Sequence, residues 1–320
     1  LVGTFSLFVR KLAPAFSELE FLKSFKTMFS FGIPLYVSTV VGGFLAQFLG
    51  ILMAMYASNA LIGNYHVSVN FTVLIAFFAI PISTVLFPAF SKLDSKEDVE
   101  ALEKIFRASV KYTSLLIIPA TTLVIVLSKP LVSTLYGATY ESAPFFLSLS
   151  ALIFLYAGLG QFSISGILNG QGETRKNMIL GLANAAVGLP LAIVLVPRFQ
   201  IIGLIIARII SGFPQIALGS FWVKKLYNIS IDWSVTAKIF LLSLITGLIT
   251  FSSVNIFSLP NWTQLLVGIT VLSAISLVLA PLFRIVNSDD IQNLRTIFSE
   301  TGLASTILHI PLEFMSKLCR

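Results

Sequence analysis

Eight stretches of about 20 mostly apolar residues, separated by charged, Gly-containing or Pro-containing segments, run along this chain of 320 residues. A helix needs about 20 apolar residues to cross the hydrocarbon core of a bilayer. Lipid cannot satisfy an open sheet edge, and the runs lack the alternation of a barrel strand. The sequence therefore predicts an all-α, polytopic transmembrane helical bundle. The expected spans are Phe31–Tyr56, Tyr65–Phe90, Lys111–Ser128, Pro144–Asn169, Asn177–Val196, Gln200–Leu226, Ile239–Phe257 and Thr263–Phe283.

Charge and cysteine content exclude several function classes. Only 11% of the residues are charged, against about a quarter in a soluble domain. The net charge of +7 is scattered in ones and twos without a basic face, so no nucleic-acid partner is expected. Cys319 is the single cysteine, which rules out an intrachain disulfide and a cysteine metal cluster. We therefore expect no cofactor and no metal site.

The distribution of Lys and Arg predicts the orientation in the membrane. One set of alternate loops carries 18 of the 21 basic residues, and such loops face the cytoplasm. Both chain ends then lie in the cytoplasm, and the protein is a multi-pass protein of the cell membrane. Outside that set are Lys129, Arg198 and the intramembrane Arg208. The set itself comprises Arg10, Lys11, Lys23, Lys26, Lys92, Lys96, Lys104, Arg107, Lys111, Arg175, Lys176, Lys224, Lys225, Lys238, Arg284, Arg295, Lys317 and Arg320.

The beginning of the chain favours a fragment of a longer protein. Residues 1–9, LVGTFSLFV, read as the end of a further span, and neither a starting methionine nor a signal-peptide pattern precedes them. Two other segments are expected to lie outside the membrane-spanning helices. Residues 98–110 carry Val99, Leu102 and Phe106 on one face and predict a helix along the cytoplasmic membrane surface. The tail from residue 291 shows a weaker pattern of the same kind.

The stretch GILNGQGETRKNM, residues 166–178, invites comparison with a phosphate-binding loop. It matches neither the Walker pattern nor GxGxxG between a strand and a helix. We interpret it as a helix end closed by glycine in a left-handed conformation, followed by a tight cytoplasmic turn with Arg175 and Lys176 at the headgroups.

Residues 135–181, LYGATYESAPFFLSLSALIFLYAGLGQFSISGILNGQGETRKNMILG, are similar to a segment of the polysaccharide flippases of the multidrug/oligosaccharidyl-lipid/polysaccharide exporter superfamily. FGIPLYVSTVVGG (31–43) resembles the start of the second helical half in that family, and IPISTVLFPAFSKL (80–93) resembles the helix that follows. The resemblance runs from about Phe21 to Phe283, and residues 201–227 are most like archaeal members.

This resemblance implies a domain organisation. Family members have twelve to fourteen spans in two lobes around a central cavity, so the chain looks like the second lobe plus a C-terminal helix pair. Residues 1–30 would hold the end of a truncated span and a cytoplasmic linker, and 31–226 the six-helix lobe. Residues 227–284 would form the extra pair and 285–320 a cytoplasmic amphipathic tail. A missing N-terminal lobe or a second copy would complete the cavity.

Arg208 is the sharpest candidate for a functional residue. It lies about a third of the way into its span, where an arginine costs on the order of 2.5 kcal/mol or more unless it meets water, a counter-charge or carbonyl groups. No acidic residue lies within any expected span. Arg208 would bind an anionic substrate group, such as a lipid-linked phosphate, through its bidentate fork. The alternatives are snorkelling to the outer headgroups and pairing with helix carbonyls.

Further candidates come from prolines and from the resemblance. Pro81, Pro119 and Pro214 remove helix hydrogen bonds and are hinge candidates, with static kinking as the alternative. The resemblance places the first two spans at the cavity, so Gln47, Tyr65 and Asn70 would contact substrate, or else only hydrogen-bond helix to helix. His66 is interpreted as a solvated histidine.

The favoured function is a flippase that moves a lipid-linked oligosaccharide, attached through phosphate to a polyprenol, to the outer leaflet by alternating access. The nearest alternative is a drug or cation exporter of the same superfamily, which would need acidic groups in its cavity. Another is a membrane glycosyltransferase, whose metal would need carboxylates such as Asp94 or the pair Asp289 and Asp290. We interpret those carboxylates as solvated charges paired with Lys and Arg, so no enzyme activity is expected. A non-transporting scaffold is a third alternative.

Overall fold

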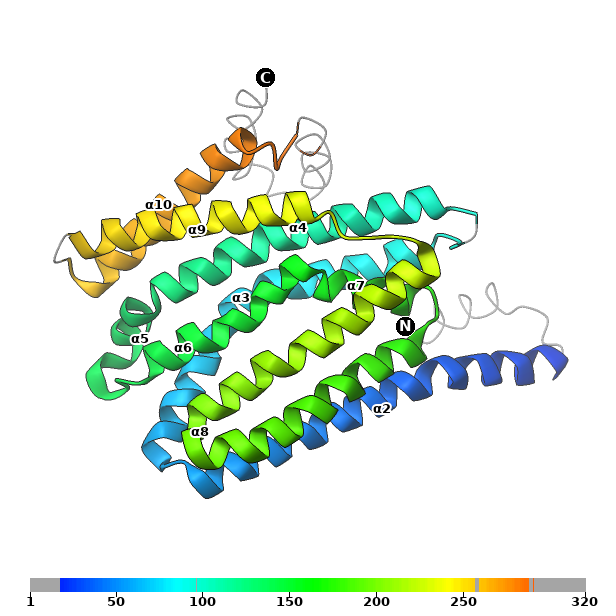
Figure 1. Ribbon diagram of the computed structural model, residues 1–320, viewed down its shortest axis with the longest axis horizontal. Coiled ribbons are helices and arrows are strands. Elements are labelled where there is room, and N and C mark those ends of the chain that lie inside the picture. Colours follow the sequence, from blue (N-terminus) through cyan, green and yellow to red (C-terminus); the bar gives the residue numbers. More distant parts are fainter. Residues whose placement is uncertain (1–17, 96, 257–258, 288–289, 291–320) are drawn as a thin grey trace, which may run out of the picture.

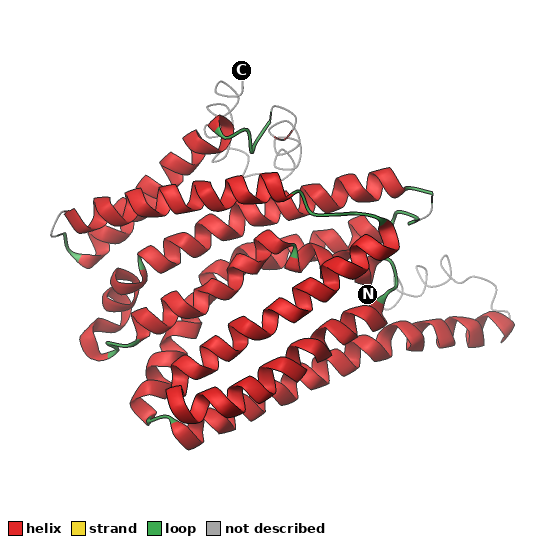
Figure 2. Ribbon diagram, viewed as in Figure 1, coloured by secondary structure: helices red, strands yellow, loops and turns green. Residues whose placement is uncertain are grey.

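The computed structural model describes residues 18–95, 97–256, 259–287 and 290, and in the stretches 18–20 and 78–85 it describes the backbone but not the side chains. The described residues form helices joined by short loops and contain no strand (Figure 2). The predicted all-helical membrane architecture is therefore confirmed. In chain order the elements are α2 (Glu18–Tyr56), α3 (Asn59–Ser91), α4 (Val99–Val126), α5 (Ser128–Tyr136), η1 (Gly137–Thr139), α6 (Ala143–Ala151), η2 (Leu152–Leu159), α7 (Gln161–Gly170), α8 (Thr174–Tyr227), α9 (Trp233–Ile256) and α10 (Asn261–Leu282).

Helix α8 is a hairpin of two spans. Its 54 residues would reach about 80 Å if straight, far more than a bilayer core needs. Gln200 breaks the helix with φ 49° and ψ −125°, and the two limbs return side by side (Figure 1). The break lies where the sequence separates the spans ending at Val196 and beginning at Gln200.

The number of membrane crossings agrees with the sequence. In the described part of the chain, six helices are long and apolar enough to cross, and the bent pair of segments 143–159 and 161–170 passes the same test when the two segments are taken as one span. Counting the two limbs of α8 separately gives the eight expected spans. The structure extends α2 from the predicted Phe31 back to Glu18, so part of the expected linker is helical, whereas residues 1–17 and the tail 291–320 lie outside the described residues.

The fourth span is broken rather than continuous. Its two parts meet at an angle of 52°, because η2 is a 3₁₀ helix and Gly160 follows it in a left-handed conformation with φ 76°. A 3₁₀ segment of this length is unusual. Asn64 of α3 stabilises the start of this span, since its Oδ1 accepts the N–H groups of Ser142 at 3.0 Å and Ala143 at 2.9 Å.

The expected surface helix at residues 98–110 is wrong. This segment forms the first turns of α4, which continues as one helix to Val126. Leu102 and Phe106 are buried against α3, α7 and the end of α8 in one hydrophobic cluster. Leu102 and Phe106 of the predicted apolar face thus pack on protein instead of lipid, whereas Val99 is 40% exposed. On the outer face of this segment, Glu103 and Arg107 form an ion pair at 2.6 Å.

The stretch 166–178 is a structural turn, as interpreted. Gly172 is left-handed with φ 77°, the N–H of Glu173 donates to the carbonyl of Leu168 at 2.7 Å, and the N–H of Gly172 donates to Asn169 at 3.1 Å. This is a Schellman motif. Gln171 also donates to the carbonyls of Phe90 at 2.6 Å and Leu93 at 2.9 Å, so it caps the end of α3.

A partly buried ion pair attaches the segment after α10 to α4. Asp290 accepts hydrogen bonds from Lys111 Nζ at 2.5 Å, Tyr112 Oη at 2.6 Å and the N–H of Asn287 at 2.7 Å. Its side chain is only 13% exposed, so the interpretation of Asp290 as a solvated charge is wrong, although its pairing with a lysine is confirmed. Asp289 lies outside the described residues.

This ion pair makes stability depend on pH on the acid side. Burial alone would raise the pKa of Asp290, but the hydrogen bonds from Lys111, Tyr112 and Asn287 outweigh it and hold the pKa below its usual range. A lowered pKa contributes stability above about pH 4, and that stability is lost as the pH falls through the folded-state pKa.

We expect Asp290→Asn to lower the free energy of unfolding by about 2 kcal/mol at pH 7, with the difference from wild type shrinking towards pH 3. Unfolding in detergent, followed by circular dichroism, measures it. Glu97→Gln, at an exposed carboxylate, is the control; an equal loss there contradicts the prediction.

Candidate functional site

A cavity of about 380 Å³ opens between α2, α3 and the two limbs of α8. It exists because α2 and α3 are joined by a short loop but then pack on different neighbours. Helix α2 runs along α8, whereas α3 packs on α6 and α7 (Figure 1). Ile153 of η2 lines the cavity as well, so the irregular span contributes to its wall.

Small residues of α2 make room for this cavity. Gly42, Ala46 and Gly50 recur every four residues and line it. Small residues at this spacing usually let two membrane helices approach closely. Here a Cβ atom built at Gly42 or Gly50 meets nothing within 4 Å, so these glycines leave open space instead of making a close helix contact.

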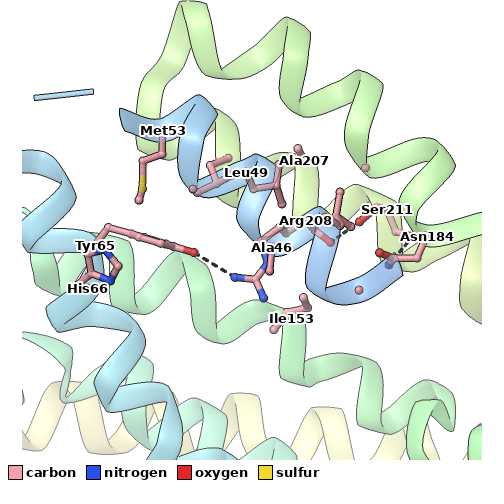
Figure 3. A pocket seen from close by; sticks show the side chains of 15 residues that line it. Ala46, Leu49, Met53, Tyr65, His66, Ile153, Asn184, Ala207, Arg208 and Ser211 are labelled. Carbon is pink, nitrogen blue, oxygen red and sulfur yellow. Dashed lines mark hydrogen bonds between the residues drawn. The ribbon is translucent and has the colours of Figure 1, made fainter. Parts of the chain in front are cut away.

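Arg208 and Tyr65 meet inside the cavity. Arg208 Nη1 donates a hydrogen bond to Tyr65 Oη at 3.0 Å, and Figure 3 shows the guanidinium group pointing across the cavity towards the ring. Arg208 lies eight residues beyond the break at Gln200, about 12 Å along the limb. Its hydrogen bond to Tyr65 and its place in the cavity lining show that the side chain extends into the cavity. Within the described residues no carboxylate forms an ion pair with it.

A second polar group lines the same cavity on the two limbs of α8. Asn184 Nδ2 donates to the carbonyl of Ser211 at 3.1 Å (Figure 3). It also donates to Gln215 Oε1 at 3.2 Å. Gly188 allows the limbs to approach here, since a Cβ would lie 3.1 Å from Ser211 Cβ. The sequence reasoning missed Asn184, although a lone amide inside an apolar span was a usable signal.

The remaining predicted site residues lie elsewhere. Gln47 and Asn70 are exposed on α2 and α3 and do not line the cavity, so their contact with substrate stays a prediction. His66 does line it, beside Tyr65, with ring centroids 6.0 Å apart.

The hinge candidates occupy different environments. Pro119 is buried within α4, and Pro214 is half-buried within the second limb of α8. Pro81 lies in the part of α3 whose side chains are not described. Their role as hinges stays a prediction.

The arrangement is suited to binding an anionic oxygen group. Arg208 has five N–H donors, and Tyr65 occupies one of them. The other donors face a cavity lined mainly by apolar side chains. Because Arg208 is exposed there, these donors are accessible to an anionic ligand, with which they would form charge-assisted hydrogen bonds. Among the described residues no three His, Cys, Asp or Glu side chains are grouped as metal ligands would be.

Comparison with known proteins gives consistent relatives. The sequence profile of a family described as "Polysaccharide biosynthesis protein" matches residues 2–145. The "Probable low-salt glycan biosynthesis flippase Agl15" of Haloferax volcanii is 21% identical over 273 residues, which covers 84% of this chain and 57% of the relative. The "Uncharacterized membrane protein MJ1068" of Methanocaldococcus jannaschii is 24% identical over 229 residues, covering 68% and 44%. The chain thus spans about half the length of these curated relatives.

Solved structures share the fold. The lipid II flippase MurJ in an inward closed conformation superposes with a TM-score of 0.56 at 21% identity, covering 88% of this chain and 56% of MurJ. An outward-facing multidrug resistance transporter of the MATE family gives a TM-score of 0.57 at 13% identity, covering 92% and 77%.

Proposed function

We propose, on the premise that this chain is a relative of the polysaccharide flippases of the multidrug/oligosaccharidyl-lipid/polysaccharide exporter superfamily, that it is part of a transporter for a lipid-linked oligosaccharide. The transporter moves this substrate from the cytoplasmic to the outer leaflet by alternating access. The observation that carries the proposal is Arg208, held by Tyr65 in an apolar cavity without a carboxylate partner among the described residues.

The chemistry of the substrate fits that cavity. A polyprenyl-linked oligosaccharide carries its charge on the phosphate that joins sugar and lipid, so a transporter needs a cation inside the membrane for that one group. A guanidinium group can hold two phosphate oxygens at once. An exporter of cationic drugs would instead need acidic groups, and the eight predicted spans contain none.

The domain organisation is part of the proposal. Residues 31–226 form the second lobe, 227–284 the additional helix pair and 285–320 a cytoplasmic tail, and both ends of the chain lie in the cytoplasm. Another lobe, or a second copy of this chain, completes the cavity; this part of the proposal is supported by the chain spanning only about half the length of its curated relatives. The exposed Gln47 and Asn70 then face the completed cavity.

A flipping assay tests the function. A complete two-lobed transporter that contains this chain is reconstituted in vesicles with a fluorescently labelled polyprenyl-diphosphate oligosaccharide, and an impermeant quencher reports the leaflet of the label. We expect the protein to bring the protected label to the quencher-accessible leaflet, while labelled phosphatidylcholine stays protected. Equal movement of both lipids, or of neither, refutes the proposal.

A further inference from the structure

A second, larger cavity lies on the other side of η2, between α4, α5, α9 and α10. Its volume is about 530 Å³. Leu155 of η2 lines this cavity, whereas Ile153 lines the cavity that contains Arg208, so η2 separates the two. No residue of the proposed flipping site takes part in it.

The second cavity is an elongated apolar groove. Along α9 its lining runs from Phe240 to Asn255, which is about 22 Å of helix and longer than one leaflet of hydrocarbon, about 15 Å. At one end the groove is closed by Phe240. The ring of Phe240 packs on Gly158, where an added Cβ would lie 2.6 Å from the ring. Gly247 brings α9 against Thr122 of α4 in the same way, at 2.5 Å.

The ammonium group and the two side-chain amides of the groove lie at its other end. Lys129 lies where α4 gives way to α5, Asn255 lies at the end of α9 and Gln264 lies near the start of α10. Within the described residues Lys129 has no ion-pair partner. The side-chain amides donate to the carbonyls of Phe251 and Leu259, and each keeps a second N–H. An ammonium group and two amides at the mouth of an apolar groove match the phosphate of a lipid.

From this geometry we infer that the groove between α4, α9 and α10 binds an anionic phospholipid, with one chain along α9 and its phosphate at Lys129. The volume holds about 18 groups of water size at about 30 Å³ each, comparable with one lipid chain. A helix of 10–12 Å diameter and this length would need several times that space. The lipid sits in the outer leaflet if the orientation proposed above holds, but the binding site itself does not rest on that orientation or on transport.

Native mass spectrometry of the purified 320-residue chain tests this site. The chain is mixed with equal amounts of phosphatidylglycerol and phosphatidylcholine, and the bound fraction of each is measured. We expect wild type to retain phosphatidylglycerol preferentially. Lys129→Ala should weaken this retention about five-fold, since a basic residue at a lipid headgroup contributes about 1 kcal/mol.

Two further variants separate the groove from surface charge. Arg198→Ala removes the other basic residue that the sequence assigns to the same membrane face; it lies at the turn of α8, outside the groove, and should leave retention unchanged. Leu248→Trp, at a 59% exposed position in the wall, should obstruct the chain and reduce retention of both lipids. The inference is overturned if wild type shows no preference, if Arg198→Ala acts like Lys129→Ala, or if Leu248→Trp has no effect.

Discussion

Replacing Arg208 with alanine in a complete transporter is expected to abolish flipping while leaving the amount of protein in the membrane unchanged. The guanidinium group is the charged donor in the cavity. In the proposed complex its removal leaves the bound phosphate without its partner, which costs about 2–5 kcal/mol for a pair that is buried on binding. That corresponds to a loss of about 30-fold or more. The fold should survive, because the side chain of Arg208 points into open space and its one described hydrogen-bond partner is the hydroxyl of Tyr65.

Milder substitutions at Arg208 and Tyr65 distinguish bidentate binding of a phosphate from a requirement for any positive charge in the cavity. Arg208→Lys keeps the charge but loses the fork, so it should retain part of the activity. Tyr65→Phe removes the hydroxyl that holds the guanidinium group and should lower the flipping rate about ten-fold, as expected for one hydrogen bond to a charged group. Arg198→Ala, at an exposed arginine outside the cavity, is the matched control. Wild-type flipping by Arg208→Ala would refute the assigned role.

The sequence located the membrane spans well because hydropathy reports directly which segments lie in lipid. It even placed the break between Val196 and Gln200, where the structure has its left-handed Gln200. Hydropathy does not report what an apolar face packs against. For this reason residues 98–110 were expected on the membrane surface, although Leu102 and Phe106 are buried among protein side chains.

The candidate site was predictable only in part. An arginine inside a span is costly and therefore conspicuous, so Arg208 stood out from sequence alone. Its contact with Tyr65 joins residues 143 positions apart, and no local pattern encodes such a pair. The cavity was even less predictable, because it forms where small residues leave space between helices, and a sequence does not show which small residues do so. Gly42 and Gly50 suggest close helix packing by their spacing, and only the structure shows that they leave space.

The break at Gln200 also sets the position of Arg208, which makes the turn of α8 a sensitive point. Gly203 lies between them, and a Cβ atom at this position would lie 2.3 Å from the carbonyl oxygen of Leu195 on the opposite limb. That obstacle is backbone and cannot rotate away as a side chain would. Gly203→Ala must therefore force the limbs apart.

We expect Gly203→Ala to lower the free energy of unfolding in detergent by more than about 2 kcal/mol and to reduce flipping, because the second limb carries Arg208 five residues further on. Gly181→Ala is the same substitution in the first limb, where an added Cβ meets nothing within 4 Å. There alanine should leave stability unchanged or raise it by up to about 1 kcal/mol, since it favours the helix. If the two variants unfold alike, the close approach of the limbs at Gly203 is not what holds the hairpin together. A large loss confined to Gly203→Ala ties the placement of Arg208 in the membrane to a single contact between the two limbs.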